Sequence, residues 1–266
     1  MRILDSIYLP ARVKPTTGER YVNCRDRTDT ALTCNRLLAA LPDKELDRLG
    51  NHLEFVYLEN GKEVCGEDEK PLYVYFPTTS IVAMLHRRED GSALEIGAVG
   101  CEGAVGAATF LEKGVFGSAI VQFEGGAYRA NIAETDEIFH QQGYLQSLLM
   151  RYTWTFLSQV LRGSMSGRHW SVEQRLTCWL LERLDRLPTN ELKMTQEMVA
   201  GMLDVRRESI TESIGTLRRK GIIRCRRGSI TVLDRDELEH LSGECYRTKH
   251  AAKPCSGQRC AGACCG

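Results

Sequence analysis

Between Arg206 and Arg227 the sequence has eight basic residues and two acidic ones, whereas the whole chain has 35 of each kind. Arginine can donate paired hydrogen bonds to the edge of a guanine or to a phosphate, and glutamate can accept one from the amino group of cytosine. A concentrated basic stretch in an otherwise neutral chain predicts an anionic partner for one part of the molecule. The alternative interpretation is a solvated basic face without a partner.

The basic residues fall within a pattern that predicts two short helices joined by a tight turn. Thr195 can cap a helix over 196–203, because its hydroxyl accepts a hydrogen bond from a free backbone N–H of the first turn. Asp204 tolerates the left-handed conformation that a tight turn requires. A second helix then covers 206–220 and ends at Gly221, where a left-handed residue would stop it.

A β-hairpin follows these two helices. The run IIRCRRGSITVL, residues 222–233, predicts two short strands with Arg227 at the tip. Ser171 and Gln174 form a capping box for a helix before the pair, and Asp234 can start a helix after the hairpin. Helix, tight turn, helix and hairpin in this order predict a winged helix-turn-helix.

This arrangement resembles the Crp/Fnr family of bacterial transcription regulators. The resemblance covers about 36–242 and is strongest in TQEMVAGMLDVRRESITESIGTLRRKGII and RRGSITVLD. It implies an α+β fold: an N-terminal β-roll that is jelly-roll-like and cyclic-nucleotide-binding-like, a long dimerisation helix, and a C-terminal winged helix-turn-helix. It also implies a homodimer that binds an inverted repeat in double-stranded DNA, with RNA polymerase and an unnamed effector as further partners.

The second helix of such a motif lies in the major groove with its first residues against the bases. The residues predicted to read bases are Arg206, Arg207, Glu208, Thr211 and Glu212. Those predicted to contact phosphates are Thr195, Gln196, Arg226 and Arg227. In the resemblance, Arg207 and Glu208 fall on the family's base-reading pair, and Glu212 replaces an arginine of cyclic-AMP-type members, so the bases read should differ. Glu208 could instead pair with an arginine of its own helix.

The chain divides into segments of different pattern. Short β-rich runs separated by turn residues predict the β-roll, with a helix near 43–49 and a hairpin turn at Asp90 and Gly91. The expected divisions are a poorly ordered arm at 1–35, the β-roll sensor domain at 36–135, the dimerisation helix at 136–166, the winged helix-turn-helix at 167–242, and a cysteine-rich tail at 243–266.

The predicted dimerisation helix has two apolar stripes on opposite sides. The stripe assigned to the dimer helix consists of Leu145, Leu149, Tyr152, Phe156 and Val160. The second consists of Met150, Trp154, Leu157 and Leu161. Two stripes imply burial on two sides, and the simplest arrangement packs one on the β-roll and the other on a partner subunit. A single apolar groove between two domains is the alternative.

The glycine-rich stretch from Val99 to Ala119 raises the question of a nucleotide pocket, because such loops often cradle phosphates. The family's phosphate-binding cassette aligns here with a set that includes Gly106, Ala107, Gly114, Gly117 and Ser118. In the resemblance, Ala107 replaces the glutamate that holds the ribose, and Gly117 replaces the arginine that neutralises the phosphate. A buried phosphate without a cation is costly. We therefore expect turns without a nucleotide site, and no cofactor.

The C-terminal cysteines suggest a second function, a metal or redox sensor that handles thiols. The candidate ligands are Cys245, Cys255, Cys260, Cys264 and Cys265, although their spacing matches no paired C-x-x-C site. The alternative is a tail whose thiols have no specific role. No catalytic set of serine, histidine and acid, no metal triad and no phosphate-binding loop occurs at an interpretable spacing, so we do not expect an enzyme.

Composition sets the remaining expectations. With 266 residues, of which 42% are apolar, the chain is long enough for two globular domains. The N-terminus lacks the pattern of a secretory signal, and the most apolar stretch, LLMRYTWTFLSQVL, is interrupted by Arg151. We therefore expect no membrane partner and a cytoplasmic protein, in which the 11 cysteines are mostly reduced.

Overall fold

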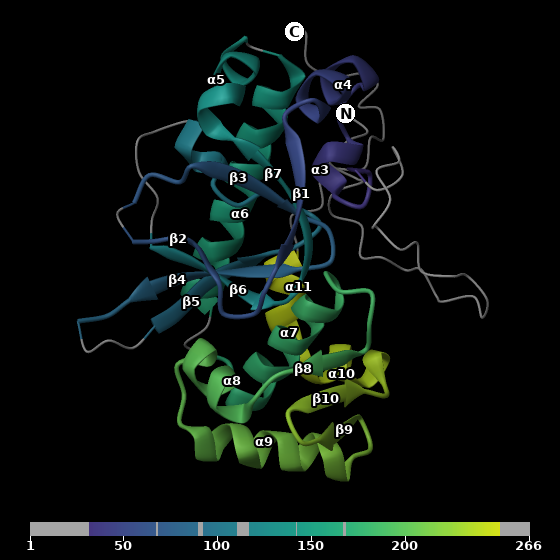
Figure 1. The fold of residues 1–266 in the computed structure, drawn as a ribbon. Coiled ribbons are helices and arrows are strands. Elements are labelled where there is room, and N and C mark those ends of the chain that lie inside the picture. Colours follow the sequence, from purple (N-terminus) through teal and green to yellow (C-terminus); the bar gives the residue numbers. More distant parts are fainter. Residues whose placement is uncertain are drawn as a thin grey trace, which may run out of the picture.

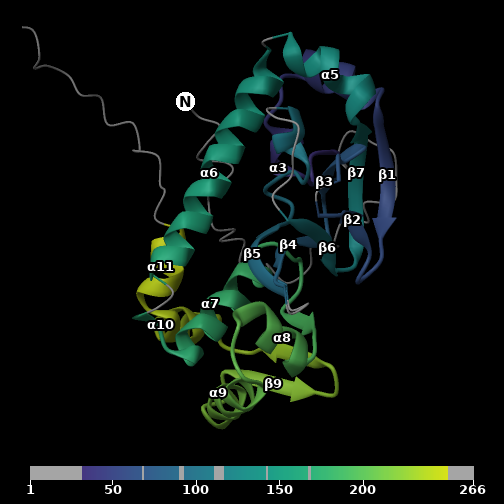
Figure 2. The same cartoon turned by 90° about the vertical axis from the view of Figure 1, so that its left-hand side faces the viewer.

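The computed structural model describes residues 32–250 except for 68, 90–92, 111–116, 142 and 167–168. A β-roll occupies one end of the molecule and a smaller C-terminal unit, residues 171–250, occupies the other (Figure 1). The helix α6 (Tyr144–Ser166) runs along one side of the β-roll down to the C-terminal unit (Figure 2). Residues 1–31 of the predicted arm lie outside the described part of the chain.

Two antiparallel sheets form the β-roll. Its elements are α3 (Arg36–Ala39), α4 (Asp43–Gly50), β1 (Leu53–Leu58), β2 (Glu63–Cys65), β3 (Tyr73–Pro77), β4 (Ile81–Arg87), β5 (Ala93–Val99), the short 3-10 helix η1 (Ala107–Phe110), β6 (Ser118–Phe123) and β7 (Gly125–Asn131). The strand orders are β1-β7-β3 and β2-β6-β4-β5. The predicted β-roll and the helix near 43–49 are confirmed. β4 and β5 pair as a hairpin, while its predicted turn at Asp90 and Gly91 lies outside the described residues.

A buried asparagine fixes the start of the described chain on the β-roll. The side chain of Asn35 caps α3 by accepting hydrogen bonds from the backbone N–H groups of Leu37 and Leu38. Its Nδ2 donates to the carbonyls of Pro77 and Gly103 at 2.8 and 2.9 Å. Every polar atom of this buried amide side chain is thus satisfied, and α3 packs its leucines into the main core.

The prediction of one continuous helix over 136–166 is wrong. The structure has α5 (Ile132–His140) and, after a short break, α6. Both carboxylate oxygens of Glu45 on α4 accept hydrogen bonds at the start of α6, from the backbone N–H of Tyr144 at 2.8 Å and of Leu145 at 2.7 Å. A carboxylate from a distant helix caps this N-terminus, which local periodicity could not reveal.

The stripe that was assigned to the dimer helix faces the chain's own β-roll. Leu145, Leu149 and Tyr152 are buried in the main core, and Phe156 packs against that core at Gly97. The sequence left open which stripe packs on the β-roll, and the structure shows that it is this one. The second stripe is the exposed one, with Met150, Trp154, Leu157 and Leu161 between 46% and 70% exposed. Both stripes exist as predicted, and the β-roll covers only the first.

The C-terminal unit has its own core. Its elements are α7 (Val172–Leu184), β8 (Glu191–Lys193), α8 (Gln196–Leu203), α9 (Arg207–Arg219), β9 (Ile223–Arg226), β10 (Ser229–Val232), α10 (Arg235–Ser242) and α11 (Glu244–His250). The capping box of Ser171 and Gln174 is confirmed, and Asp234 caps α10. The strand β8 escaped prediction because three residues are too short a run to give a strand signal, but it pairs with β10 and completes a three-stranded sheet.

The C-terminal unit extends beyond residue 242, where its end was expected. The first residues of the predicted tail form α11, which packs against α6 and α7. Cys245 is 1% exposed, and the hydroxyl of Tyr246 donates to Asp185 at 2.6 Å. Burial and the carboxylate of Asp185 raise the pKa of Tyr246 above its usual value, so this hydroxyl remains a donor. Residues 251–266 lie outside the described part.

Candidate nucleic-acid interface

The turn between α8 and α9 has the geometry that the sequence predicts. Thr195 caps α8, with its hydroxyl accepting a hydrogen bond from the backbone N–H of Met198 at 3.1 Å. Asp204 has φ 51° and ψ 54°, the left-handed conformation, and is the one residue other than glycine with positive φ in the described chain. Arg175 on α7 donates to the carbonyl of Leu203, which holds the end of α8.

The helix α9 has one buried and one exposed side. Its buried side consists of Ile210, Ser213, Ile214 and Leu217. The five residues predicted to read bases, Arg206, Arg207, Glu208, Thr211 and Glu212, are all exposed. In Figure 1, α9 lies at the edge of the C-terminal unit farthest from the β-roll. The tertiary structure therefore leaves one edge of α9, with arginine, glutamate and threonine side chains, exposed to solvent.

Contacts between α8 and α9 hold two of these side chains. The guanidinium Nε of Arg207 lies 3.6 Å from a carboxylate oxygen of Glu197. The hydroxyl of Thr211 donates to Gln196 Oε1 at 2.7 Å. Gln196 was predicted to contact phosphate and is instead engaged with Thr211 in this structure. Glu197 escaped the sequence analysis, although the start of a helix facing the next helix was the signal that could have found it.

The alternative role of Glu208, an ion pair with an arginine of its own helix, does not occur in the structure. Within the described part of the chain Glu208 forms no ion pair, and the ion pair of Arg207 runs to Glu197 on α8. Both are exposed at the start of α9. Their side chains therefore need break only a solvent-exposed pair to contact a ligand, which costs little.

The hairpin supplies a second group of exposed cations. β9 and β10 pair antiparallel, and Gly228 at the tip has φ 77°. Arg226 and Arg227 are exposed, as a phosphate contact requires. Arg224 on β9 is also exposed and was not singled out in the sequence, because the run of arginines does not reveal which side chains point outward. Helix α9 and the hairpin thus present cations on two neighbouring elements.

The sequence of this unit matches a known domain. Residues 174–241 match the profile of the Crp-like helix-turn-helix domain. The C-terminal unit is a Crp-like helix-turn-helix domain. No curated protein matches the chain. The match includes α7 through most of α10, so the helix-turn-helix domain contains all of the predicted base-reading and phosphate-contacting residues.

Solved structures extend the likeness to the β-roll. TTHB099, a transcriptional regulator of the CRP family from Thermus thermophilus, has a TM-score of 0.60 and 16% identity over 71% of this chain and 96% of its own. FixK2 from Bradyrhizobium japonicum has a TM-score of 0.59 and 17% identity, over 72% of this chain and 98% of its own. TTHA1359, a CRP/FNR family regulator also from Thermus thermophilus, has a TM-score of 0.58 and 22% identity, over 71% of this chain and 98% of its own. The chain therefore has the Crp/Fnr fold, with its helix-turn-helix domain at the C-terminus.

The glycine-rich cassette is packed as a set of turns. Gly106 and Gly117 have φ of 87° and 79°, and Ala107 lies buried in η1. A Cβ at Gly117 would overlap the carbonyl oxygen of Leu85. An arginine therefore cannot replace Gly117 in this backbone. Ser118 is fully buried, whereas Gly114 lies outside the described residues.

Aromatic side chains pack between the β-roll and the helices α5 and α6. The rings of Phe110 and Phe139 stack with centroids 4.3 Å apart. Tyr152 lies so close to Gly103 that a Cβ there would overlap its hydroxyl oxygen. Phe156 is in similar contact with Gly97, 2.8 Å from the corresponding Cβ position. The side of α6 that faces the cassette is thus in van der Waals contact with the β-roll.

Of the cysteines proposed as a cluster, Cys245 lies on α11 and is 1% exposed. The other four cysteines of the predicted set, Cys255, Cys260, Cys264 and Cys265, lie outside the described residues. Within the described ranges, histidine, cysteine, aspartate and glutamate form no group of three that could hold a metal ion. In the same ranges, no helix is both long and apolar enough to span a bilayer.

Proposed function

We propose that the chain is a Crp/Fnr-type transcription regulator that binds an inverted repeat in double-stranded DNA as a homodimer. The observation that carries this proposal is α9, which leaves a polar edge with Arg207, Glu208 and Glu212 exposed at the end of a Crp-like helix-turn-helix domain. An arginine and two glutamates on adjacent turns suit guanine and cytosine edges in the major groove. Thr195 at the start of α8 and Arg226 and Arg227 on the hairpin are exposed and would contact phosphates.

The homodimer would form through the exposed stripe of α6. Trp154 is 70% exposed, and Met150, Leu157 and Leu161 extend the apolar surface along the same side of the helix. Large apolar side chains gathered in this way on a soluble protein mark an interface. Pairing α6 with α6 about a two-fold axis covers this surface on both copies and places two α9 helices on one side of the dimer. Such a pair matches the two half-sites of an inverted repeat.

The sensor domain would not bind cyclic nucleotides. Three observations support this: Gly117 cannot be replaced by a phosphate-binding arginine in its present backbone, Ala107 has no polar group, and aromatic rings pack beneath the cassette. The effector has different chemistry, and RNA polymerase is the expected partner at promoters by resemblance to the family. A cytoplasmic location follows from the same role.

The test compares two arginines that are expected to act on different parts of DNA binding. Arg207→Ala should cost roughly 1–3 kcal/mol on a duplex selected from a randomised pool and should relax discrimination at one base pair. Arg227→Ala should weaken binding to all sequences and lower the slope of log affinity against log salt by about one. Salt titrations on the selected duplex and on a scrambled one separate these effects.

The exposed Lys44 on α4 supplies a matched control, because Lys44→Ala removes a positive charge far from the helix-turn-helix domain. Its affinity for both duplexes should equal that of the unchanged protein. An equal loss of affinity for the selected and the scrambled duplex in Arg207→Ala would make Arg207 a phosphate contact and refute the proposed placement of α9.

A further inference from the structure

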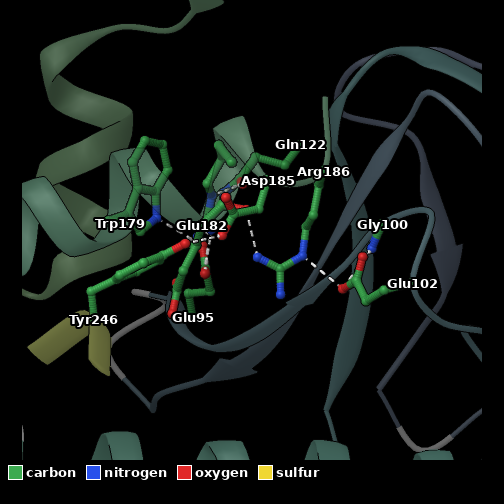
Figure 3. A network of polar contacts seen from close by, with 10 residues as sticks. Glu95, Gly100, Glu102, Gln122, Trp179, Glu182, Asp185, Arg186 and Tyr246 are labelled. Atoms are coloured by element: carbon green, nitrogen blue, oxygen red, sulfur yellow. Dashed lines mark hydrogen bonds and ion pairs between the residues drawn. The ribbon is translucent and has the colours of Figure 1, made fainter. Parts of the chain in front are cut away.

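The helix-turn-helix domain is joined to the β-roll by a buried polar network, drawn in part in Figure 3. Arg183 on α7 has no exposed side-chain surface, and its guanidinium pairs with the carboxylate of Glu95 on β5. Its Nε donates to Gln122 Oε1 on β6 at 2.9 Å, and Gln122 Nε2 donates to Glu95 at 2.9 Å. The guanidinium also stacks on the ring of Trp179, 4.1 Å from its centroid. Arg183 also pairs with the neighbouring Glu182 at 3.3 Å, so contacts on several sides fix the orientation of its guanidinium.

A second arginine, one turn further along, repeats the arrangement. Arg186 Nε lies 2.7 Å from Glu102, in the loop after β5, and its Nη1 donates to the carbonyl of Glu182 at 2.6 Å. Burial lowers the pKa of Arg186, but the charges of Glu102 and Glu182 outweigh it and raise the pKa overall, so the group stays charged. At Gly100 a Cβ would lie 2.8 Å from the Arg186 side chain, so the glycine permits this close approach.

An exposed ion pair connects the β-roll directly to the turn of the helix-turn-helix. Arg88, just after β4, donates to both carboxylate oxygens of Asp204 at 2.8 and 2.6 Å. Asp204 is the left-handed residue between α8 and α9. The β4–β5 hairpin therefore contacts the residue that sets the angle between these two helices.

The chemistry of this joint favours one orientation. Apolar residues of the β-roll, Ile81, Ala98 and Phe123, belong to the core of the helix-turn-helix domain, but apolar contacts alone tolerate sliding. Buried charges do not tolerate sliding. Each has lost its hydration, and moving it away from its partner leaves an uncompensated buried charge, which is strongly destabilising. Glu95 and Glu102 lie on β5 and the loop that leads to the cassette, so a displacement of that strand would move both partners together.

We propose that Arg183 and Arg186 are positioning residues. Through Glu95 and Glu102 they fix the orientation of the helix-turn-helix domain, and of its α9, relative to the β-roll of the same chain. They thereby set the half-site spacing that the homodimer accepts. This inference rests on the proposed function. A homodimer with loosely held helix-turn-helix domains would still bind each half-site but would tolerate several spacings, because α9 itself is unchanged.

The test uses the full-length homodimer and DNA duplexes selected from a randomised pool. Affinities are measured for the selected inverted repeat, for repeats lengthened or shortened by about one or two base pairs, and for an isolated half-site. The variants are Glu95→Gln and Glu102→Gln, which keep the side-chain shape but remove the charge that faces each arginine. Arg88→Ala removes the exposed ion pair with Asp204 and leaves the buried network intact, so it measures what the exposed contact of the joint contributes.

The expected result is a loss of spacing discrimination without a loss of half-site binding. The preference of the unchanged protein for its selected spacing should fall by at least about fivefold in Glu95→Gln and Glu102→Gln, the lower end of typical coupling between sites. Arg88→Ala should show a smaller fall in the same direction. Affinity for the isolated half-site should stay within about twofold of the unchanged protein. Glu54→Gln is the control, because it removes a carboxylate that pairs with Arg129 between two strands of the β-roll, away from the joint.

Two results would overturn the inference. One is spacing discrimination that survives in a folded Glu95→Gln or Glu102→Gln protein. The other is a parallel loss of half-site affinity, because it would mean that the network supports α9 itself rather than its placement. If the unchanged protein selects no inverted repeat from the pool, the proposed function fails first, and that outcome is distinguishable because it requires no variant.

Discussion

The two faces of α6 have similar apolar side chains but differ in what covers them. The inner face, with Leu149 and Tyr152, is buried against the β-roll of the same chain. The outer face, with Trp154 and Leu157, is 70% and 46% exposed at these residues. The same helix therefore contributes to two different equilibria: the inner face to the folding of one chain and, in our proposal, the outer face to the pairing of two chains.

The difference shows that an apolar stripe indicates burial but does not name the surface that buries it. Both stripes satisfy the helical periodicity equally well. Only the position of the β-roll beside α6 distinguishes the face that belongs to the fold from the face left for a second copy. Substitutions on the two faces should therefore affect different measurements.

The largest expected effect is on the inner face. Leu149→Ala removes a side chain that is 2% exposed and leaves a cavity between α6 and the β-roll. The free energy of unfolding should fall by about 2–5 kcal/mol. Urea denaturation followed by circular dichroism measures this loss. The difference in unfolding free energy between Leu149→Ala and the unchanged protein should be the same at every protein concentration. A loss below 0.5 kcal/mol, by the scale of ordinary surface substitutions (about ±0.5 kcal/mol), would mean that the inner face does not contribute to the fold as described.

The next effect is on the outer face. Trp154→Glu places a charge in the centre of the proposed α6–α6 contact, and loss of such an aromatic anchor typically costs about 2–4 kcal/mol of association free energy. Sedimentation should show a shift from dimer to monomer, while the far-ultraviolet circular dichroism spectrum stays that of the unchanged protein.

The exposed Tyr57 on β1 offers a control for this substitution. It is 56% exposed and lies on the sheet away from the outer stripe of α6. Tyr57→Glu should leave the protein dimeric. A dimer that persists in Trp154→Glu would show that the two copies, if they pair, do so through another surface.

The smallest effect separates the apolar faces of α6 from the charged joint at the helix-turn-helix domain. A hydrogen bond from Arg88 lowers the pKa of Asp204 below its usual value. A lowered carboxyl pKa contributes stability above the unfolded-state pKa near 3.8, and this contribution disappears as pH falls below it. Asp204→Asn should thus cost about 0.2–1 kcal/mol at pH 7, as expected of an exposed pair.

Denaturation at several pH values measures this contribution. The cost of Asp204→Asn should shrink as the pH falls from about 4 through the lowered pKa of Asp204, because the carboxylate is protonated there and loses its charge. The cost of Leu149→Ala should not follow this pH profile, because leucine does not titrate. A cost of Asp204→Asn that is unchanged by acid would show that it does not arise from the charge of Asp204 and its pair with Arg88, because asparagine tolerates the left-handed conformation as well as aspartate does.

Local signals predicted the helix-turn-helix domain well. Thr195 as a cap, Asp204 as the left-handed turn residue and Gly221 as the end of α9 are all confirmed, because each depends on backbone geometry within a few residues. The base-reading assignments stay predictions, but the exposure that they require is present in the structure.

Features that depend on distant residues escaped the sequence analysis. The cap at the start of α6 comes from Glu45, 100 residues before Leu145, and the burial of Cys245 depends on α11 packing against α6 and α7. The buried network of Arg183 and Glu95 was also missed, since these residues are 88 positions apart. Nothing in the local pattern distinguishes such residues from solvated charges.

The sequence by itself determined the caps and the turn of the helix-turn-helix and the apolar faces of its helices and of α6, because caps, turns and periodicity act over one or two helical turns. The tertiary structure alone decided which apolar face of α6 the β-roll covers, and that a side chain at Gly117 has no room beside Leu85. It also decided that α7 docks on β5 through buried charges. These outcomes depend on close packing and on the pairing of desolvated charges between segments far apart in the chain, and no local rule specifies such contacts.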